Sequence, residues 1–141
     1  MAGDWVVPDE GKLKMDDEVF RLTTAREAFV LDQFQSNTTV GDASTGADFT
    51  IATYTGYAQI AIARGDWSAA VISGGVGLIQ KTVNPVFTCS GGSAQTIYGL
   101  LLRGATSGII YCGVNYTTPI SMVAGATDTI NPLAVRDKTL V

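Results

Sequence analysis

The chain has 141 residues, enough for one domain of ordinary size, and 46% of them are apolar, 16% charged and 9% aromatic. This composition is too apolar and too weakly charged for a disordered chain. The net charge of −4 gives no basic surface for a nucleic acid. Histidine is absent, which removes the commonest general base and the commonest zinc ligand. We therefore expect a globular protein that is not an enzyme, holds no metal or cofactor, and has no nucleic-acid partner.

No segment has the composition of a targeting or membrane element. Asp4 stands where a secretory signal peptide would have basic residues before an apolar run. The apolar runs of the chain are interrupted well before the ~20 residues that a membrane-spanning helix needs. We expect a soluble chain that is made without export and has no membrane partner.

The first 27 residues differ in composition from the rest. Twelve of the charged residues of the chain lie within the first 32 positions, mixed with scattered apolar residues. This N-terminal segment forms either a short helix near residues 16–28 or an extended arm that becomes ordered only against a neighbouring molecule, and the pattern leaves both interpretations open. As an arm it would contact a partner through four apolar side chains, Trp5 (which suits a pocket on another subunit), Val6, Val7 and Phe20.

From residue 28 onward the pattern changes to short runs of β-forming residues separated by Gly-containing turns. Large and small residues alternate over residues 57–63, as expected for a strand between two faces. The segment Gly104–Ser107 joins two strong runs, 95–103 and 108–116, and predicts a hairpin. The other expected elements are strands at 28–34, 69–72, 77–81, 86–89, 119–123 and 128–131, a polar loop over 35–47, and a terminal segment over 133–141.

About eight short strands, spaced by roughly 8–12 residues, indicate an all-β protein with a single β-sandwich, of which the jelly roll is one form. No apolar period of helical length interrupts the strands, so α/β folds are disfavoured. We therefore divide the chain into an N-terminal arm or short helix, residues 1–27, and a β-sandwich domain, residues 28–141.

Charges are scarce in the β-forming region. Between Trp67 and Thr127 only Lys81 and Arg103 are charged. The outward positions of an isolated sandwich usually include many charged residues, whereas here they would be Thr, Ser, Ala, Gly, Ile and Tyr. Coverage by partner subunits explains such a surface, so we expect a homo-oligomer or a larger assembly.

The aromatic residues fall into two groups. Tyr98 and Tyr111 lie inside the strongest predicted strands and are expected in the core or in a subunit interface. Tyr54 and Trp67 lie beside predicted turns, so we expect them to be exposed and available for contact with a partner.

Three further features suggest sites only weakly. Cys89 and Cys112 are wrongly spaced for a metal site, and they are either half-buried core thiols or a cross-strand disulfide. The Gly-rich segment 74–77 lacks the Lys-Ser/Thr pair of a phosphate loop. The acidic run 16–18 lacks the ligand spacing of a calcium loop and is best explained as a solvated charge run.

Two blocks of the chain are distinctive, Phe29–Phe34 and Ala47–Ala58, and the second ends in Gly56-Tyr57-Ala58. Weaker matches are the opening Val7–Gly11, Trp67, Phe87-Thr88, Ile97–Leu100 and the closing Asp128–Leu133. Together these blocks resemble a family of proteins encoded by tailed bacteriophages, from which the chain departs by having Ile51 where an acid is usual and by having Cys112.

The resemblance implies a non-enzymatic structural protein of the virion. The hypothesis that we prefer is a protein that decorates the capsid surface and cements it. Its expected partners are the major capsid protein and copies of itself, with a trimer among the possible oligomers. It would be located on the virion and made in the cytoplasm of the bacterial host. The family has no catalytic motif, so no site residue follows from the resemblance.

A second hypothesis is a host-recognition module on a tail fibre or spike. Tyr54, Trp67 and the loop over 35–47 would then contact a receptor or a surface glycan. We expect a fibre protein to have a long trimeric shaft or an attachment domain, and the sequence shows neither. The first hypothesis is therefore favoured.

Overall fold

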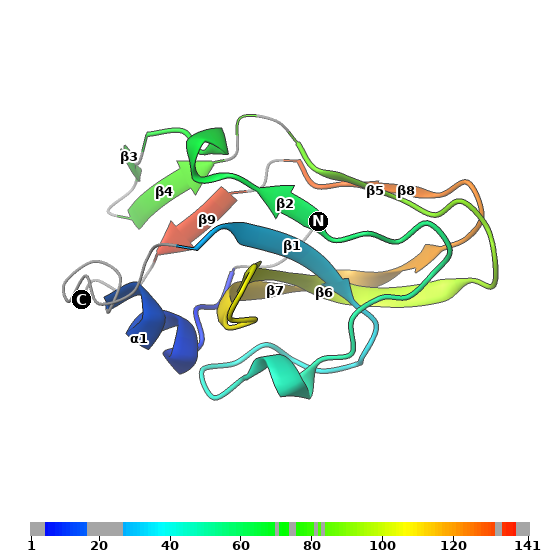
Figure 1. Ribbon diagram of the computed structural model, residues 1–141, viewed down its shortest axis with the longest axis horizontal. Helices are drawn as coiled ribbons and strands as arrows, with labels where there is room; N and C mark the ends of the chain where they lie inside the picture. Colours follow the sequence, from blue (N-terminus) through cyan, green and yellow to red (C-terminus); the bar gives the residue numbers. More distant parts are fainter. Residues whose placement is uncertain are drawn as a thin grey trace.

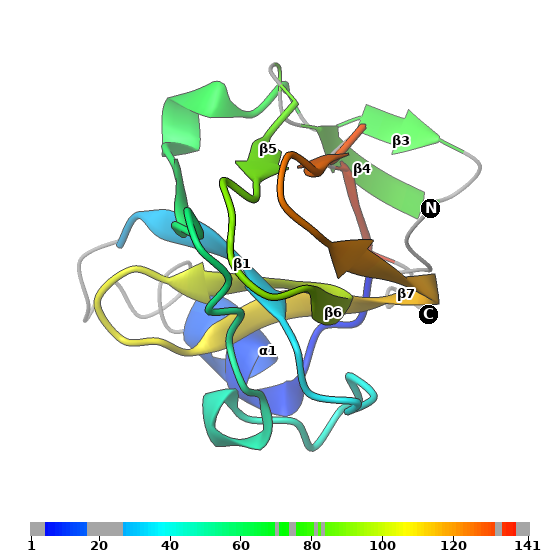
Figure 2. The same ribbon diagram turned by 90° about the vertical axis from the view of Figure 1, so that its right-hand side faces the viewer.

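The chain folds into three layers (Figures 1 and 2). The computed structural model describes residues 5–16, 27–69, 71–73, 76–80, 82, 84–131 and 134–137. A four-stranded antiparallel sheet forms the middle layer, and two smaller sheets lie over one of its faces. A helix and the loop of residues 35–50 lie over the other face. The prediction of an all-β sandwich is confirmed.

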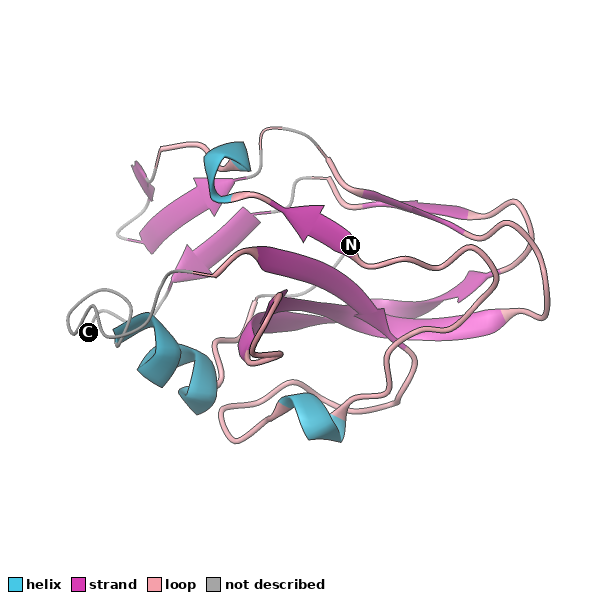
Figure 3. Cartoon of the chain, viewed as in Figure 1, coloured by secondary structure: helices cyan, strands magenta, loops and turns pink. Residues whose placement is uncertain are grey.

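The middle sheet has the order β2-β1-β6-β7. Its strands are β1 (Phe29–Phe34), β2 (Ile60–Ile62), β6 (Gln95–Gly104) and β7 (Ile110–Met122). The outer layer consists of a three-stranded sheet, β3-β4-β9, and a two-stranded sheet, β5-β8. Their strands are β3 (Val71–Ser73), β4 (Val76–Gln80), β5 (Val86–Thr88), β8 (Thr127–Thr129) and β9 (Ala134–Asp137). Figure 3 shows these strands, together with helix α1 (Asp9–Asp16) and the single turns η2 (Gly46–Asp48) and η3 (Arg64–Asp66).

The predicted hairpin is the longest element of the fold. β6 and β7 pair from Arg103↔Ile110 to Gln95↔Met122. The register shifts between Ile97↔Ile120 and Gly99↔Asn115, so one residue of β6 is opposite the four residues 116–119 of β7. Pro119 lies in this bulge, where its missing N–H costs no ladder hydrogen bond. The strand predicted over 119–123 is therefore the continuation of β7.

The other predicted strands are present, with the bounds of β3 and β8 shifted by one or two residues from the predicted runs 69–72 and 128–131. β2 is shorter than the predicted run 57–63. The N–H of Tyr57 donates to the carbonyl of Tyr54 at 2.9 Å, which closes a turn and keeps residues 57–59 out of the sheet. Large and small residues alternate over the whole segment 57–63, but the segment pairs with β1 only from Ile60 to Ile62.

The described part of the N-terminal segment packs on β7. Val6 and Gly113 exchange backbone hydrogen bonds of 2.7 and 2.8 Å, and α1 follows directly. Gly11 is buried in α1, and a Cβ there would overlap the backbone of Ile110, so only glycine permits this approach of helix to strand. The sequence pattern does not predict a helix over 9–16. The short helix that it allows near residues 16–28 falls mostly on residues 17–26, which lie outside the described residues.

Two apolar clusters lie on the two faces of the middle sheet. The larger cluster fills the space toward β5 and β8 and includes Leu31, Phe87 and Met122. The smaller cluster lies under the loop of residues 35–50 and includes Phe34 and Phe49, whose rings meet edge to face at 4.9 Å. The side-chain amide of Asn115 holds this loop, since it accepts from the N–H of Val40 and donates to the carbonyl of Thr38, both at 2.8 Å.

Candidate functional site

A network of polar side chains runs through the interior beside the segment of residues 52–59. Asp32, on β1, is only 1% exposed. Its Oδ2 accepts hydrogen bonds from Nε and Nη2 of Arg103, on β6, at 2.8 and 2.6 Å. Its Oδ1 accepts one from the hydroxyl of Tyr57 at 2.6 Å, and that hydroxyl accepts from the backbone N–H of Gln33 at 3.3 Å. Arg103 therefore neutralises a carboxylate that would otherwise be costly to bury.

Gln33, the next residue of β1, extends the network toward the outer layer. Its Oε1 accepts from the hydroxyl of Tyr54 at 2.6 Å, and its Nε2 donates to Oδ2 of Asp128, on β8, at 2.7 Å. The same Asp128 oxygen accepts a short hydrogen bond from the hydroxyl of Tyr116, on β7. The network thus joins β1, β6, β7, β8 and the irregular segment of residues 52–59.

Burial keeps the three tyrosines of the network protonated. Burial and the negative charge of Asp128 raise the pKa of Tyr54 to about 12. Burial and the hydrogen bond to Asp32 raise the pKa of Tyr57, and burial and the charge of Asp128 raise that of Tyr116. A phenol with a raised pKa keeps its proton at neutral pH, so it remains a hydrogen-bond donor and is not present as the phenolate that would act as a base or nucleophile. The network is therefore suited to holding the layers together.

The distinctive sequence blocks 29–34, 47–58 and 128–133 supply most of this network. Asp32 and Gln33 belong to the block 29–34, Tyr54 and Tyr57 to the block 47–58, and Asp128 to the closing block. Gly56 adopts a φ of 87°, and a Cβ there would overlap the side chain of Ser90. The polar residues and the glycine of these blocks therefore have a structural role, because they stabilise the fold.

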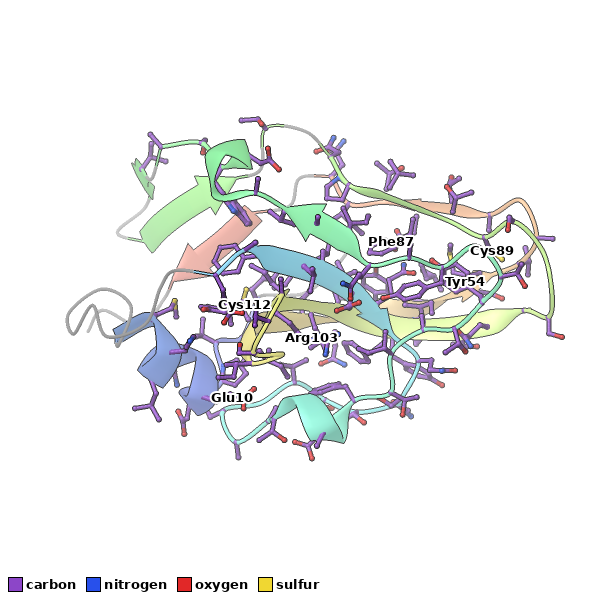
Figure 4. The ribbon with its side chains drawn as sticks, viewed as in Figure 1. Glu10, Tyr54, Phe87, Cys89, Arg103 and Cys112 are labelled. Atoms are coloured by element: carbon purple, nitrogen blue, oxygen red, sulfur yellow. The ribbon has the colours of Figure 1, made fainter. Side chains whose placement is uncertain are left out.

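The expectation that Tyr54 is exposed is wrong. Its side chain is 5% exposed, because the turn beside it directs the ring into the larger cluster. The ring meets that of Tyr57 edge to face at 5.3 Å. Figure 4 shows Tyr54 with Phe87 and Cys89 on the inner side of β5. Tyr54 is therefore a core residue rather than a contact residue.

Trp67 is half-buried and packs against the larger cluster. Its indole Nε1 is buried and has no hydrogen-bond partner, alone among the buried side-chain polar atoms of the described residues. Tyr111 lies in the core, as expected, and its ring meets that of Phe29 at 4.8 Å. Tyr98 is half-buried against the smaller cluster.

Trp5, Val6 and Val7 are half-buried against the body of the same chain. Trp5 and Val7 pack on the larger cluster and Val6 on the smaller one, as alternating side chains of an extended segment beside β7 would. Phe20 lies outside the described residues. Contact of this segment with a partner therefore stays a prediction, and in the monomer three of its four expected anchors cover the chain's own core.

Two carboxylates connect the N-terminal segment and the hairpin. Glu10, labelled in Figure 4, accepts a hydrogen bond from the N–H of Ile110 at 2.8 Å. Glu27 accepts from the N–H groups of Thr106 and Ser107 at 2.8 and 2.9 Å, and it pairs with Lys14 at 3.7 Å. Burial raises the pKa of Glu27, but the hydrogen bonds from Ser107 and Thr106 and the charge of Lys14 outweigh it, so this pKa lies below its usual value.

Cys89 and Cys112 are both buried and both free, so the alternative of a disulfide is wrong. The Sγ of Cys89 donates to the carbonyl of Gly91 at 3.4 Å. Burial raises the pKa of Cys112, which disfavours its reactive thiolate. The two thiols fill core positions.

Among the described residues, no group of three His, Cys, Asp or Glu side chains is placed to hold a metal ion. In the same part of the chain, no helix is long and apolar enough to cross a membrane.

The charges of the described surface are distributed unevenly along the chain. Every exposed residue from Asn84 to Asn131 is uncharged, and these exposed residues, mainly Thr, Ser, Gly and Ala, are termed here the uncharged surface. The two charged residues of this range, Arg103 and Asp128, are half-buried and engaged in the internal network. Charge is thus missing from the outer side of these strands because the few charged residues there point inward.

Exposed acids lie instead on α1 and on the loop of residues 35–50. They include Asp9 and Asp42, which Lys12 bridges at 3.1 and 3.4 Å, and Asp48 on η2. The sequence predicted a surface poor in charge, and the structure shows that it is formed by the exposed residues between 84 and 131.

Comparison of the chain with known protein-family models and with curated proteins finds no match. The fold defines the chain as an all-β sandwich protein.

Proposed function

We propose that the chain is a non-enzymatic structural protein of a tailed-bacteriophage virion, which decorates the capsid and cements it. The resemblance of its sequence blocks to a phage family suggests the setting. The uncharged surface is the single observation on which the proposed role as an assembly protein depends.

An uncharged surface suits permanent contact with other subunits. Removing a Lys or Glu side chain from water costs free energy unless it is paired. Ala and Val side chains have no polar group to desolvate, and the hydroxyl groups of Thr and Ser can both donate and accept hydrogen bonds across a contact. Val86 and Val123 are 48% and 47% exposed on this surface and would gain free energy from burial. Binding only to the assembled shell would stabilise the shell by mass action.

The structure favours capsid decoration over a receptor-binding module. Tyr54, one of the expected contacts for a glycan, is buried. The loop over 35–47 is pinned to the sheet by Asn115 through two hydrogen bonds of 2.8 Å. Of the residues expected to contact a receptor, Trp67 is half-buried and supplies only part of a binding platform.

The copy number of the protein in purified virions of the phage that encodes it tests the proposal. A decorating protein is expected in numbers comparable to those of the major capsid protein, whereas a fibre or spike protein would be present in a handful of copies. Binding of the purified protein to heads that lack it should change little as salt rises, since the uncharged surface offers no ion pairs to screen. Absence from the virion, or binding to host cells and not to such heads, would overturn it.

A further inference from the structure

We draw no further inference here: the strongest candidate, the N-terminal segment of residues 5–16 that packs on β7 and that two copies of the chain would exchange, carries nothing because its connection to the sandwich runs through residues 17–26, which lie outside the described residues.

Discussion

The guanidinium of Arg103 donates hydrogen bonds from Nε and Nη2 to a single carboxylate oxygen of Asp32, at 2.8 and 2.6 Å. The two residues are 71 positions apart in the sequence, on the neighbouring strands β1 and β6. The other Asp32 oxygen accepts from Tyr57 at 2.6 Å. One buried carboxylate thus ties the central strands to the irregular segment that covers their edge.

Loss of Arg103 should be strongly destabilising. Arg103→Met keeps the length of the side chain and leaves Asp32 buried without a counter-charge, which we expect to lower the free energy of unfolding by about 3 kcal/mol. Urea unfolding followed by tryptophan fluorescence measures the loss.

A double variant separates the ion pair from packing. Asp32→Leu combined with Arg103→Met removes both charges and should recover part of the stability lost in Arg103→Met. If the double variant is less stable than Arg103→Met by the full cost of a second substitution, the pairing of these two charges does not explain the loss.

Tyr57→Phe removes the hydroxyl that donates to Asp32 and accepts from the N–H of Gln33. Oδ1 of Asp32 and the N–H of Gln33 each lose this buried hydrogen-bond partner, while Oδ2 of Asp32 keeps Arg103, so stability should fall by about 1–3 kcal/mol. Tyr98→Phe is the matched control, because in the described part of the chain the hydroxyl of Tyr98 has no hydrogen-bond partner. Equal losses in the two variants would contradict the role given to the Tyr57 hydroxyl.

Alkaline pH should destabilise the fold through the buried tyrosines. The pKa of Tyr54 is raised to about 12, and those of Tyr57 and Tyr116 are also raised. An unfolded tyrosine loses its proton near pH 10, so the unfolded state binds fewer protons above that pH, and stability falls as pH rises. Absorbance at the phenolate band should show these tyrosines titrating only as the protein unfolds. Reversible titration of these three tyrosines at the ordinary pKa of a phenol in the folded state would contradict this.

Acid pH should weaken the contact between the N-terminal segment and the hairpin. The folded pKa of Glu27 lies below its usual value, so its contribution to stability is complete above that value and is lost as pH falls through the folded pKa. Glu27→Gln should cost about 1–3 kcal/mol at neutral pH and reduce the loss of stability on acidification. Asp48→Asn is a control on an exposed carboxylate. If the stability of Glu27→Gln falls on acidification as steeply as that of the original chain, other carboxylates account for the loss.

The sequence predicted what depends on local pattern. Alternating β-forming residues and Gly-containing turns located β1, β6 and the β6-β7 hairpin, because period-two burial and turn chemistry are encoded over a few neighbouring residues. The scarcity of charge likewise predicted an uncharged surface, since it is a property of composition.

Contacts between distant residues could not be predicted in the same way. Gln33 and Asp128 are 95 positions apart, and nothing in either segment alone points to the other. Tyr54 lies beside a turn, a position typical of exposed residues, and only the course of the chain over the larger cluster directs it inward. α1 contains Gly11, which lowers helix propensity, and its packing on β7 stabilises it.

The most direct test of the assembly role is a comparison of side-chain oxidation by hydroxyl radicals in the free protein and in intact virions. The account predicts that oxidation of Val86 and Val123 falls in the particle, since other subunits cover them there, while oxidation of the exposed Leu13 on α1 stays the same. Unchanged oxidation of both valines in particles that contain the protein would contradict it.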